Sequence, residues 1–444
     1  MPFFSAVPPA LLYWLPGSLL LLMLSLALTS ILIHAPWLSY IAGAAAWVAG
    51  SLLLERLQPS QRMQTLVLFS LGLVCLLIGL LNGAPIHYLL NALEANQILL
   101  AMLVGVSFLR LLAQSGQAEQ EQLPKGRRAL WQTLLGCHLI GAVINMSALV
   151  IIGDRLSRTQ PMNTLQGLIL VRAFSICACW SPFFASMGVV FICSPEARLG
   201  EMLPYALPLS LVGLLVSAFQ IARHPEVDST VGYPMHWQAL RLPLLLAGMV
   251  MLGQILWPQV SVLTLVTLIA LLSTLIGLPI LRGRKQALAQ FKVHLEQGLP
   301  EMKGEVTLFL GAAMLAAGVS ALLESLHLQL APDHFGGLEA SLTLITLTGL
   351  AVIGLHPVTS SLLASSLLAP SNPDPSLLGL TLLMGWAIGV SVSPFSGVQL
   401  SLQGRYGVRL VELLRLNTGY GPLMVFMGCG LLYLYAYVHS LTSG

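Results

Sequence analysis

Residues 180–188 read WSPFFASMG, and residues 391–399 read SVSPFSGVQ. Each stretch carries a Ser-Pro-Phe triplet, beginning at Ser181 or Ser393, in the middle of a long apolar run. Because proline removes a backbone donor and clashes with the preceding turn, each run is predicted to be a helix that breaks at the triplet. Broken helices at membrane depth are tolerated only where they face protein or a cavity instead of lipid. The two triplets therefore predict a membrane protein with a polar interior site.

The composition also indicates a membrane protein. The chain has 444 residues, of which 56% are hydrophobic and 8% are charged, and its mean hydropathy is +0.85. Soluble proteins carry about 25% charged residues, so this composition excludes a water-soluble enzyme and a disordered protein. Lys and Arg number 20 and Asp and Glu number 17, a near-neutral balance that gives no reason to expect nucleic-acid binding.

Apolar runs near the length of a membrane span recur along the whole chain. They fall at 11–33, 37–54, 63–82, 86–112, 131–153, 163–194, 203–222, 239–257, 259–281, 303–325, 336–369, 376–402 and 419–440. If every run crossed the membrane, basic clusters would lie on both sides, against the positive-inside tendency. Two runs are therefore predicted to be re-entrant hairpins, at 131–154 and 336–369, which leaves 11 transmembrane helices in an all-α polytopic fold. The N-terminus is then cytoplasmic and the C-terminus periplasmic.

The second half of the chain repeats landmarks of the first half at a nearly constant offset. Asn145 and His356 are 211 residues apart, and the two Ser-Pro-Phe triplets are 212 residues apart. The predicted topology gives matching runs opposite directions, so the repeats are predicted to be inverted, a layout found in secondary transporters. The expected parts are an extra span at 1–36, a first repeat at 37–222, a cytoplasmic linker at 223–238 and a second repeat at 239–440.

Within the repeats, the runs 163–194 and 376–402 are the expected broken helices. The segment 284–298 is predicted to be an amphipathic surface helix, with its Lys and Arg side chains at the level of the lipid headgroups.

The predicted hairpin tips and helix breaks supply the candidate site. Polar side chains there stand in the middle of apolar runs, and the breaks free backbone carbonyls and helix ends. Uncharged oxygens suit Na⁺, whereas helix N-termini suit an anion. The expected substrate-binding residues are Asn145, Ser147, His356, Thr359, Ser360 and Arg172, and the expected cation-binding residues are Ser181, Ser186, Ser393, Ser396 and Gln399.

Two of these residues have alternative interpretations. Arg172 is the only charged residue within 163–194, which marks a functional site by default, but its side chain could equally snorkel to the cytoplasmic headgroups. His356 is either a proton-linked or substrate-binding residue or a satisfied core histidine.

In layout, residues 37–440 resemble the ion transporter superfamily, which includes divalent anion:sodium symporters, arsenite permeases and citrate carriers. The matching features are the 11 spans, two hairpins each followed by a broken helix, and the opening EVTLFLGAAMLAAGVSALLES of the second repeat. The sodium-coupled carboxylate carriers of that group hold a Ser-Asn-Thr motif at each tip. Here the first tip reads Asn145-Met146-Ser147 and the second reads His356-Pro357-Val358-Thr359. The resemblance implies sodium sites at Ser181–Gly188 and Ser393–Gln399.

Together these features predict a secondary active transporter of a bacterial inner membrane. It would move a small, organic anion by an elevator-type alternating-access mechanism coupled to Na⁺ or H⁺. A cation/proton antiporter of the same fold and a membrane subunit of a larger transport complex are the alternatives. The acidic residues are scattered, so we expect neither an enzyme nor a cofactor, and no metal beyond Na⁺. The expected partners are a small anion, the lipid bilayer and, as one option, a second copy in a homodimer.

Overall fold

The computed structural model describes residues 9–94, 96–113, 123–158, 160–235, 241–328 and 330–441. Within these ranges all regular secondary structure is helical, apart from one isolated antiparallel bridge between Lys125 and Val231. The predicted all-α class is thus confirmed for the described residues. The start of the expected extra span (1–8) and the end of the expected linker (236–238) lie outside them.

Nine helices in the described part of the chain are long and apolar enough to cross a membrane. They are Trp14–Leu32, Trp37–Leu54, Pro59–Leu81, His87–Leu112, Leu199–Ala222, Val262–Arg282, Lys303–Ser325, Pro375–Tyr406 and Tyr420–Val438. Three shorter apolar helices accompany them, at Thr164–Cys177, Arg241–Leu256 and Gly337–Val352. A chain with this many apolar helices is a multi-pass membrane protein; the count of 11 spans stays a prediction.

The chain divides into two compact units. The first unit takes residues 1–115 and 253–330, and the second takes 116–252 and 331–444. Each unit thus combines a segment from both predicted repeats. Helix α12 (Arg241–Leu256) crosses the division.

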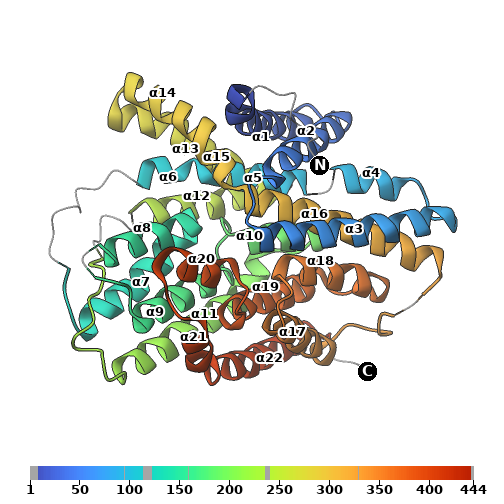
Figure 1. Cartoon of the computed structure of the whole chain (residues 1–444). Helices are drawn as coiled ribbons and strands as arrows, with labels where there is room; N and C mark the ends of the chain where they lie inside the picture. Colours follow the sequence, from blue (N-terminus) through green and yellow to red (C-terminus); the bar gives the residue numbers. More distant parts are fainter. Residues whose placement is uncertain are drawn as a thin grey trace. The chain divides into compact units, whose positions relative to one another are not determined.

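The first unit is built from continuous helices and short connecting helices. Its elements are α1 (Pro9–Leu32), α2 (Trp37–Leu54), α3 (Pro59–Leu81), α4 (His87–Glu94), α5 (Gln97–Ser107), α6 (Leu109–Ala113), α13 (Val262–Arg282), α14 (Arg284–Val293), η2 (His294–Gly298), α15 (Leu299–Glu301) and α16 (Lys303–Ser325) (Figure 1). The segment expected as a surface helix, 284–298, is α14 followed by the π-helical turn η2.

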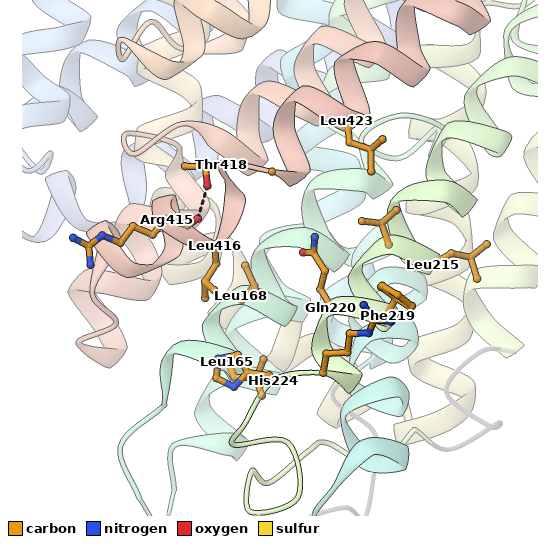
Figure 2. A pocket seen from close by; sticks show the side chains of 13 residues that line it. Leu165, Leu168, Leu215, Phe219, Gln220, His224, Arg415, Leu416, Thr418 and Leu423 are labelled. Carbon is orange, nitrogen blue, oxygen red and sulfur yellow. Dashed lines mark hydrogen bonds between the residues drawn. The ribbon is translucent and has the colours of Figure 1, made fainter.

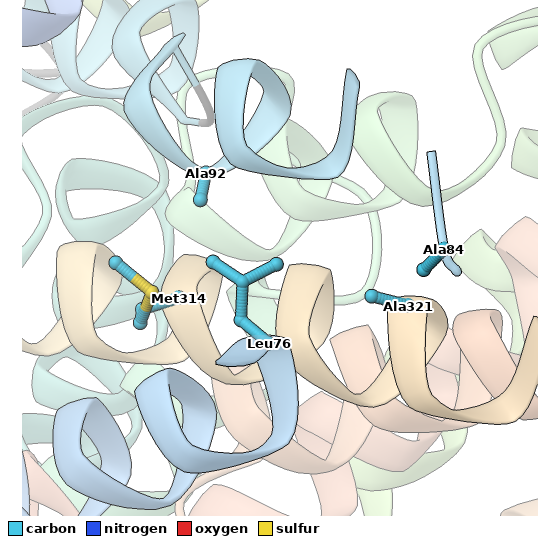
Figure 3. Packing of buried hydrophobic residues seen from close by; sticks show 5 residues of the cluster. All are labelled: Leu76, Ala84, Ala92, Met314 and Ala321. Atoms are coloured by element: carbon cyan, nitrogen blue, oxygen red, sulfur yellow. The ribbon is translucent and has the colours of Figure 1, made fainter. Parts of the chain in front are cut away.

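Helices α3 and α16 lie side by side and touch at glycines. A Cβ atom added at Gly318 would lie 2.1 Å from the carbonyl oxygen of Gly72, and one added at Gly72 would lie 2.5 Å from the backbone nitrogen of Leu315. Small residues allow such close backbone approach between membrane helices. Next to this contact, Figure 3 shows a buried cluster of Leu76, Ala84, Ala92, Met314 and Ala321.

Replacing Gly318 by Ala should push α3 and α16 apart. Because the added methyl group has no space, we expect a loss of about 1–3 kcal/mol of unfolding free energy, seen as a lower melting temperature in detergent. Gly248→Ala in α12 is the matched control, since a Cβ there meets nothing within 4 Å. Equal melting temperatures for the two variants would contradict the close contact.

The second unit contains helical hairpins and interrupted helices. Its elements are α7 (Arg127–Ile144), α8 (Met146–Leu156), α9 (Thr164–Cys177), α10 (Ala185–Cys193), α11 (Leu199–Ala222), α17 (Gly337–Val352), α18 (Pro357–Leu368), η3 (Ala369–Ser371), α19 (Pro375–Val392), α20 (Gly397–Tyr406), α21 (Leu410–Asn417) and α22 (Tyr420–Val438). The pairs α7–α8 and α17–α18 occupy the predicted hairpin segments. The pairs α9–α10 and α19–α20 are the interrupted helices that follow them.

Candidate functional site

The first hairpin turns at a single residue. Asn145 links α7 to α8 with φ 50° and ψ −137°, a conformation that residues with a Cβ rarely adopt. The chain reverses there, so that a Cβ built on Gly141 would lie 3.9 Å from the Ala148 Cβ atom. The side-chain nitrogen Nδ2 of Asn145 donates to the Phe183 carbonyl at 3.0 Å. The tip is therefore tied to the break of the helix that follows it.

At the first break, residues 178–184, two of the serines expected to bind a cation, Ser181 and Ser186, form hydrogen bonds with the backbone. The Ser181 hydroxyl donates to the Ala142 carbonyl of α7 and accepts from the Phe183 N–H at 3.2 Å. The Ser186 hydroxyl donates to the Ala178 carbonyl at 2.6 Å. Both side chains are buried; the Ser181 proton is donated to the last turn of α7, and the Ser186 proton to a carbonyl at the break. A small cavity of about 70 Å³ lies beside Ser181.

The second hairpin turns through a glycine and then a histidine. Gly354 has φ 106°, and the Leu355 N–H donates to the Leu350 carbonyl at 2.9 Å, which closes the end of α17. His356 then caps α18, because its Nδ1 atom accepts from the Val358 N–H at 3.2 Å. A ring nitrogen that accepts carries no proton, so the neutral imidazole has its hydrogen on Nε2. No partner for Nε2 is found among the described residues.

The polar residues after His356 differ in whether their side chains have hydrogen-bond partners. The Ser360 hydroxyl donates to the Pro357 carbonyl at 3.2 Å. The Thr359 hydroxyl is buried and has no hydrogen-bond partner within the described ranges. On the first hairpin, Ser147 is half-buried at the start of α8. The N-terminal end of α18 thus presents two donors, His356 Nε2–H and the Thr359 hydroxyl, that the described residues do not use.

The second break lies at residues 393–396. Ser393 accepts from the Phe395 N–H at 3.3 Å, and Ser396 caps α20 by accepting from the Gln399 N–H at 3.3 Å. The Gln399 side-chain nitrogen donates to the Ser391 carbonyl at 3.0 Å. Its Oε1 atom is buried without a partner among the described residues. A buried oxygen of this kind is an unused acceptor at the break.

Arg172 is buried inside the second unit and does not reach solvent. It is 1% exposed, and its guanidinium donates to Asn417 Oδ1 at 2.9 Å, Gln220 Oε1 at 2.6 Å and the Leu416 carbonyl at 2.7 Å. The guanidinium also stacks 4.3 Å from the ring centroid of Tyr420. Every one of these partners is neutral. Because the side chain is 1% exposed, it does not snorkel outward, and its role in a functional site stays a prediction.

The structure connects Arg172 to the second break. Asn417, which accepts from Arg172, donates through Nδ2 to the Ser391 carbonyl at 2.9 Å, the same carbonyl that Gln399 contacts. The two candidates assigned to different roles in the sequence, Arg172 and Gln399, therefore share one hydrogen-bond network. The candidate residues named from the sequence include neither Asn417 nor Gln220. The signal at Gln220 is a polar side chain at the end of an apolar helix.

His138 is a buried histidine beside the first break. Its Nδ1 atom lies 3.0 Å from the Ala173 carbonyl, and its Nε2 atom accepts from the Trp180 indole at 3.1 Å. A carbonyl needs a donor and an indole N–H needs an acceptor, so the neutral tautomer with hydrogen on Nδ1 satisfies both contacts. This arrangement holds His138 as a neutral core residue.

An ion pair joins the end of the first hairpin to the end of the second broken helix. Arg405 donates to both carboxylate oxygens of Asp154 at 2.8 Å, and the Tyr406 hydroxyl donates to Oδ1 at 2.8 Å. These Arg405 hydrogen bonds hold the pKa of Asp154 below its usual range. Asp154 is thus a structural carboxylate at the chain surface.

Comparison with known proteins gives a structural likeness but no sequence likeness. No family model matches the sequence, and no curated protein matches it. The chain is similar to the crystal structure of the YdaH transporter of Alcanivorax borkumensis, which is described as having an unusual topology. The TM-score is 0.45 and the identity 16%, over 84% of this chain and 98% of that chain. At such low identity, residues that carry function in one chain need not correspond to residues in the other.

Asn145 offers a test of the first hairpin tip. Asn145→Ala and Asn145→Gly both lose the bond to Phe183, but only Ala adds the cost of a positive φ. We expect the Ala variant to be less stable than the Gly variant by about 1–2 kcal/mol, measured by thermal unfolding in detergent. An Ala variant as stable as the Gly variant would show that the turn is not strained.

Arg172 offers a test of the buried network. Lys keeps the charge but cannot reach three acceptors in a fork, so Arg172→Lys should lose about 2–4 kcal/mol of unfolding free energy. Arg198→Lys is the control, because the Arg198 side chain is 78% exposed and should change stability by no more than about 0.5 kcal/mol. A tolerated Arg172→Lys exchange would argue against the fork.

Proposed function

We propose that the chain is a secondary active transporter that moves a small, organic anion across the membrane. The supporting observation is that the second unit collects both hairpins and both helix breaks, while the first unit has none of these four elements. Unsatisfied polar groups and helix ends at membrane depth are expected where they are buried in protein or line a cavity, and a ligand pathway is such a place. In this proposal the second unit carries the substrate as one body, in an elevator-type movement.

Two features support an anion as the substrate. The first is the N-terminus of α18, where the helix dipole and the unused donors of His356 and Thr359 favour a negative group. The second is the buried charge of Arg172, which has only neutral partners among the described residues. A bound anion would offset this charge in a medium of low dielectric constant. The tip residues Asn145 and Ser147 would close the site from the other hairpin.

The coupling cation is proposed to bind at the breaks. Na⁺ and H⁺ are both candidates for this cation. Gln399 Oε1 is an unused oxygen, and the hydroxyl oxygens of Ser181, Ser186, Ser393 and Ser396 still have lone pairs. Oxygens of this kind are hard ligands that suit Na⁺. The antiporter alternative needs a titratable group at the site, and His356 is the candidate for it. His138 is not, because its hydrogen bonds leave it no free position for a proton.

Transport in proteoliposomes tests the function. Gradients of Na⁺ and of H⁺ are imposed separately, and radiolabelled organic anions are screened for accumulation. We expect one gradient to drive uptake and the other to have little effect. Absence of gradient-driven flux for every anion, with protein that melts cooperatively, would contradict the proposal. Exchange of Na⁺ for H⁺ without any anion would favour the antiporter.

Thr359→Val tests the anion site without disturbing the fold. The exchange keeps the shape but removes a hydroxyl that no described residue uses, so stability should be unchanged or slightly raised. Loss of a hydrogen bond to a charged ligand should weaken the apparent affinity for the transported anion about ten- to a hundredfold.

Thr348→Val is the matched control, because the Thr348 hydroxyl in α17 is also buried without a partner in the described chain. It should leave transport unchanged. If both valine variants transport like the unmodified protein, Thr359 does not contact the substrate.

A further inference from the structure

A cavity whose lining includes no residue of the two helix breaks lies in the second unit. It has a volume of about 860 Å³ and lies between α9, α11, α21 and the start of α22. Figure 2 shows Phe219 and Gln220 on α11, and Leu416 and Thr418 across from them. Most lining side chains are Leu, Val or Phe, and no lining residue is acidic. The cavity is thus apolar, and every ionisable group in its lining is basic.

An exposed apolar stripe leads along α11 into this cavity. Leu207, Leu211, Leu215 and Phe219 follow at intervals of four residues and are 45%, 57%, 59% and 56% exposed. Residues four apart lie on one face of a helix, and this stripe is about 18 Å long. Large apolar side chains exposed on a membrane helix face lipid tails. The stripe is thus slightly longer than the hydrocarbon depth of one leaflet, which is about 15 Å.

The stripe ends in positive charge. Arg223 follows Phe219 at the next interval of four, and its guanidinium lies 3.8 Å from the Phe219 ring centroid. Gln220 and Leu416, which both line the cavity, accept hydrogen bonds from the buried Arg172. The Arg415 side chain points away from the cavity in Figure 2, so Arg223 and Arg172 supply the charge at this end.

We propose that this cavity binds an anionic phospholipid. The acyl chain would lie on the stripe from Leu207 to Phe219, and the phosphate would lie near Arg223, with the charge of Arg172 behind Gln220. An apolar groove that ends in cations matches a molecule with an apolar tail and an anionic head. A free anion would leave the stripe uncovered, and a zwitterionic lipid would gain less from the two arginines. Arg172 also enters the proposed transport function, so the lipid site is tested by lipid binding and not by transport.

Native mass spectrometry of the full-length protein in mild detergent tests the lipid site. The probes are dioleoyl phosphatidylglycerol, dioleoyl phosphatidylcholine and glycerol phosphate. Phosphatidylglycerol should bind on the order of twentyfold more tightly than phosphatidylcholine, since each arginine contributes about fivefold. Arg223→Gln should weaken phosphatidylglycerol binding about fivefold. Arg198→Gln, at the opposite end of α11, should leave it unchanged.

A second variant narrows the cavity. Gly419 lines it, and a Cβ there meets nothing within 4 Å, so Gly419→Leu should fold and weaken lipid binding. Equal binding of the two lipids, or phosphatidylglycerol binding that neither variant changes, would overturn the proposal. Competition by glycerol phosphate as strong as by phosphatidylglycerol would overturn the assignment to a lipid. If Gly419→Leu does not melt cooperatively, Arg223→Gln alone decides.

Discussion

Where a helix is interrupted out of reach of water, the backbone carbonyls that lose their helical hydrogen bonds need new donors. The structure of the second unit depends on which side chains supply those donors. At the first break the Ser186 hydroxyl donates to the Ala178 carbonyl, and at the second the Gln399 amide donates to the Ser391 carbonyl. In both cases donor and acceptor are 8 residues apart. Each broken helix therefore satisfies its first half from its second half, and avoids a cost of roughly 2–7 kcal/mol for each unpaired group.

The two hairpins meet the same constraint in different ways. The first tip is closed by hydrogen bonds, from Asn145 to the Phe183 carbonyl and from Ser181 to the Ala142 carbonyl. The second tip is closed by its own backbone at Gly354, and leaves the donors of His356 and Thr359 without a partner in the described chain. Since buried donors are normally paired, the Thr359 hydroxyl is the exception at this tip, whereas His356 is half-buried. The two hairpin tips therefore differ in how far their polar groups are satisfied within the described chain.

Polar contacts between the two halves of the chain bind the second unit together. Arg172 contacts Asn417 across 245 residues of sequence, and Arg405 contacts Asp154 across 251. The Ser376 hydroxyl donates to Glu201 at 2.7 Å. Separating the two halves of this unit would leave the buried side chains of Arg172 and Asn417 unpaired.

The sequence by itself determined the all-α membrane class, the positions of the two hairpins and the two helix breaks. These follow from local properties, namely apolar run length, proline geometry and polar residues within apolar runs. Only the tertiary structure decided that both breaks belong to one unit and that Arg172 is buried. It also decided that the hydroxyls of Ser181 and Ser186 donate hydrogen bonds to backbone carbonyls. Those outcomes depend on which groups meet across long separations in sequence, and no local pattern around Arg172 or Asn417 specifies that they pair.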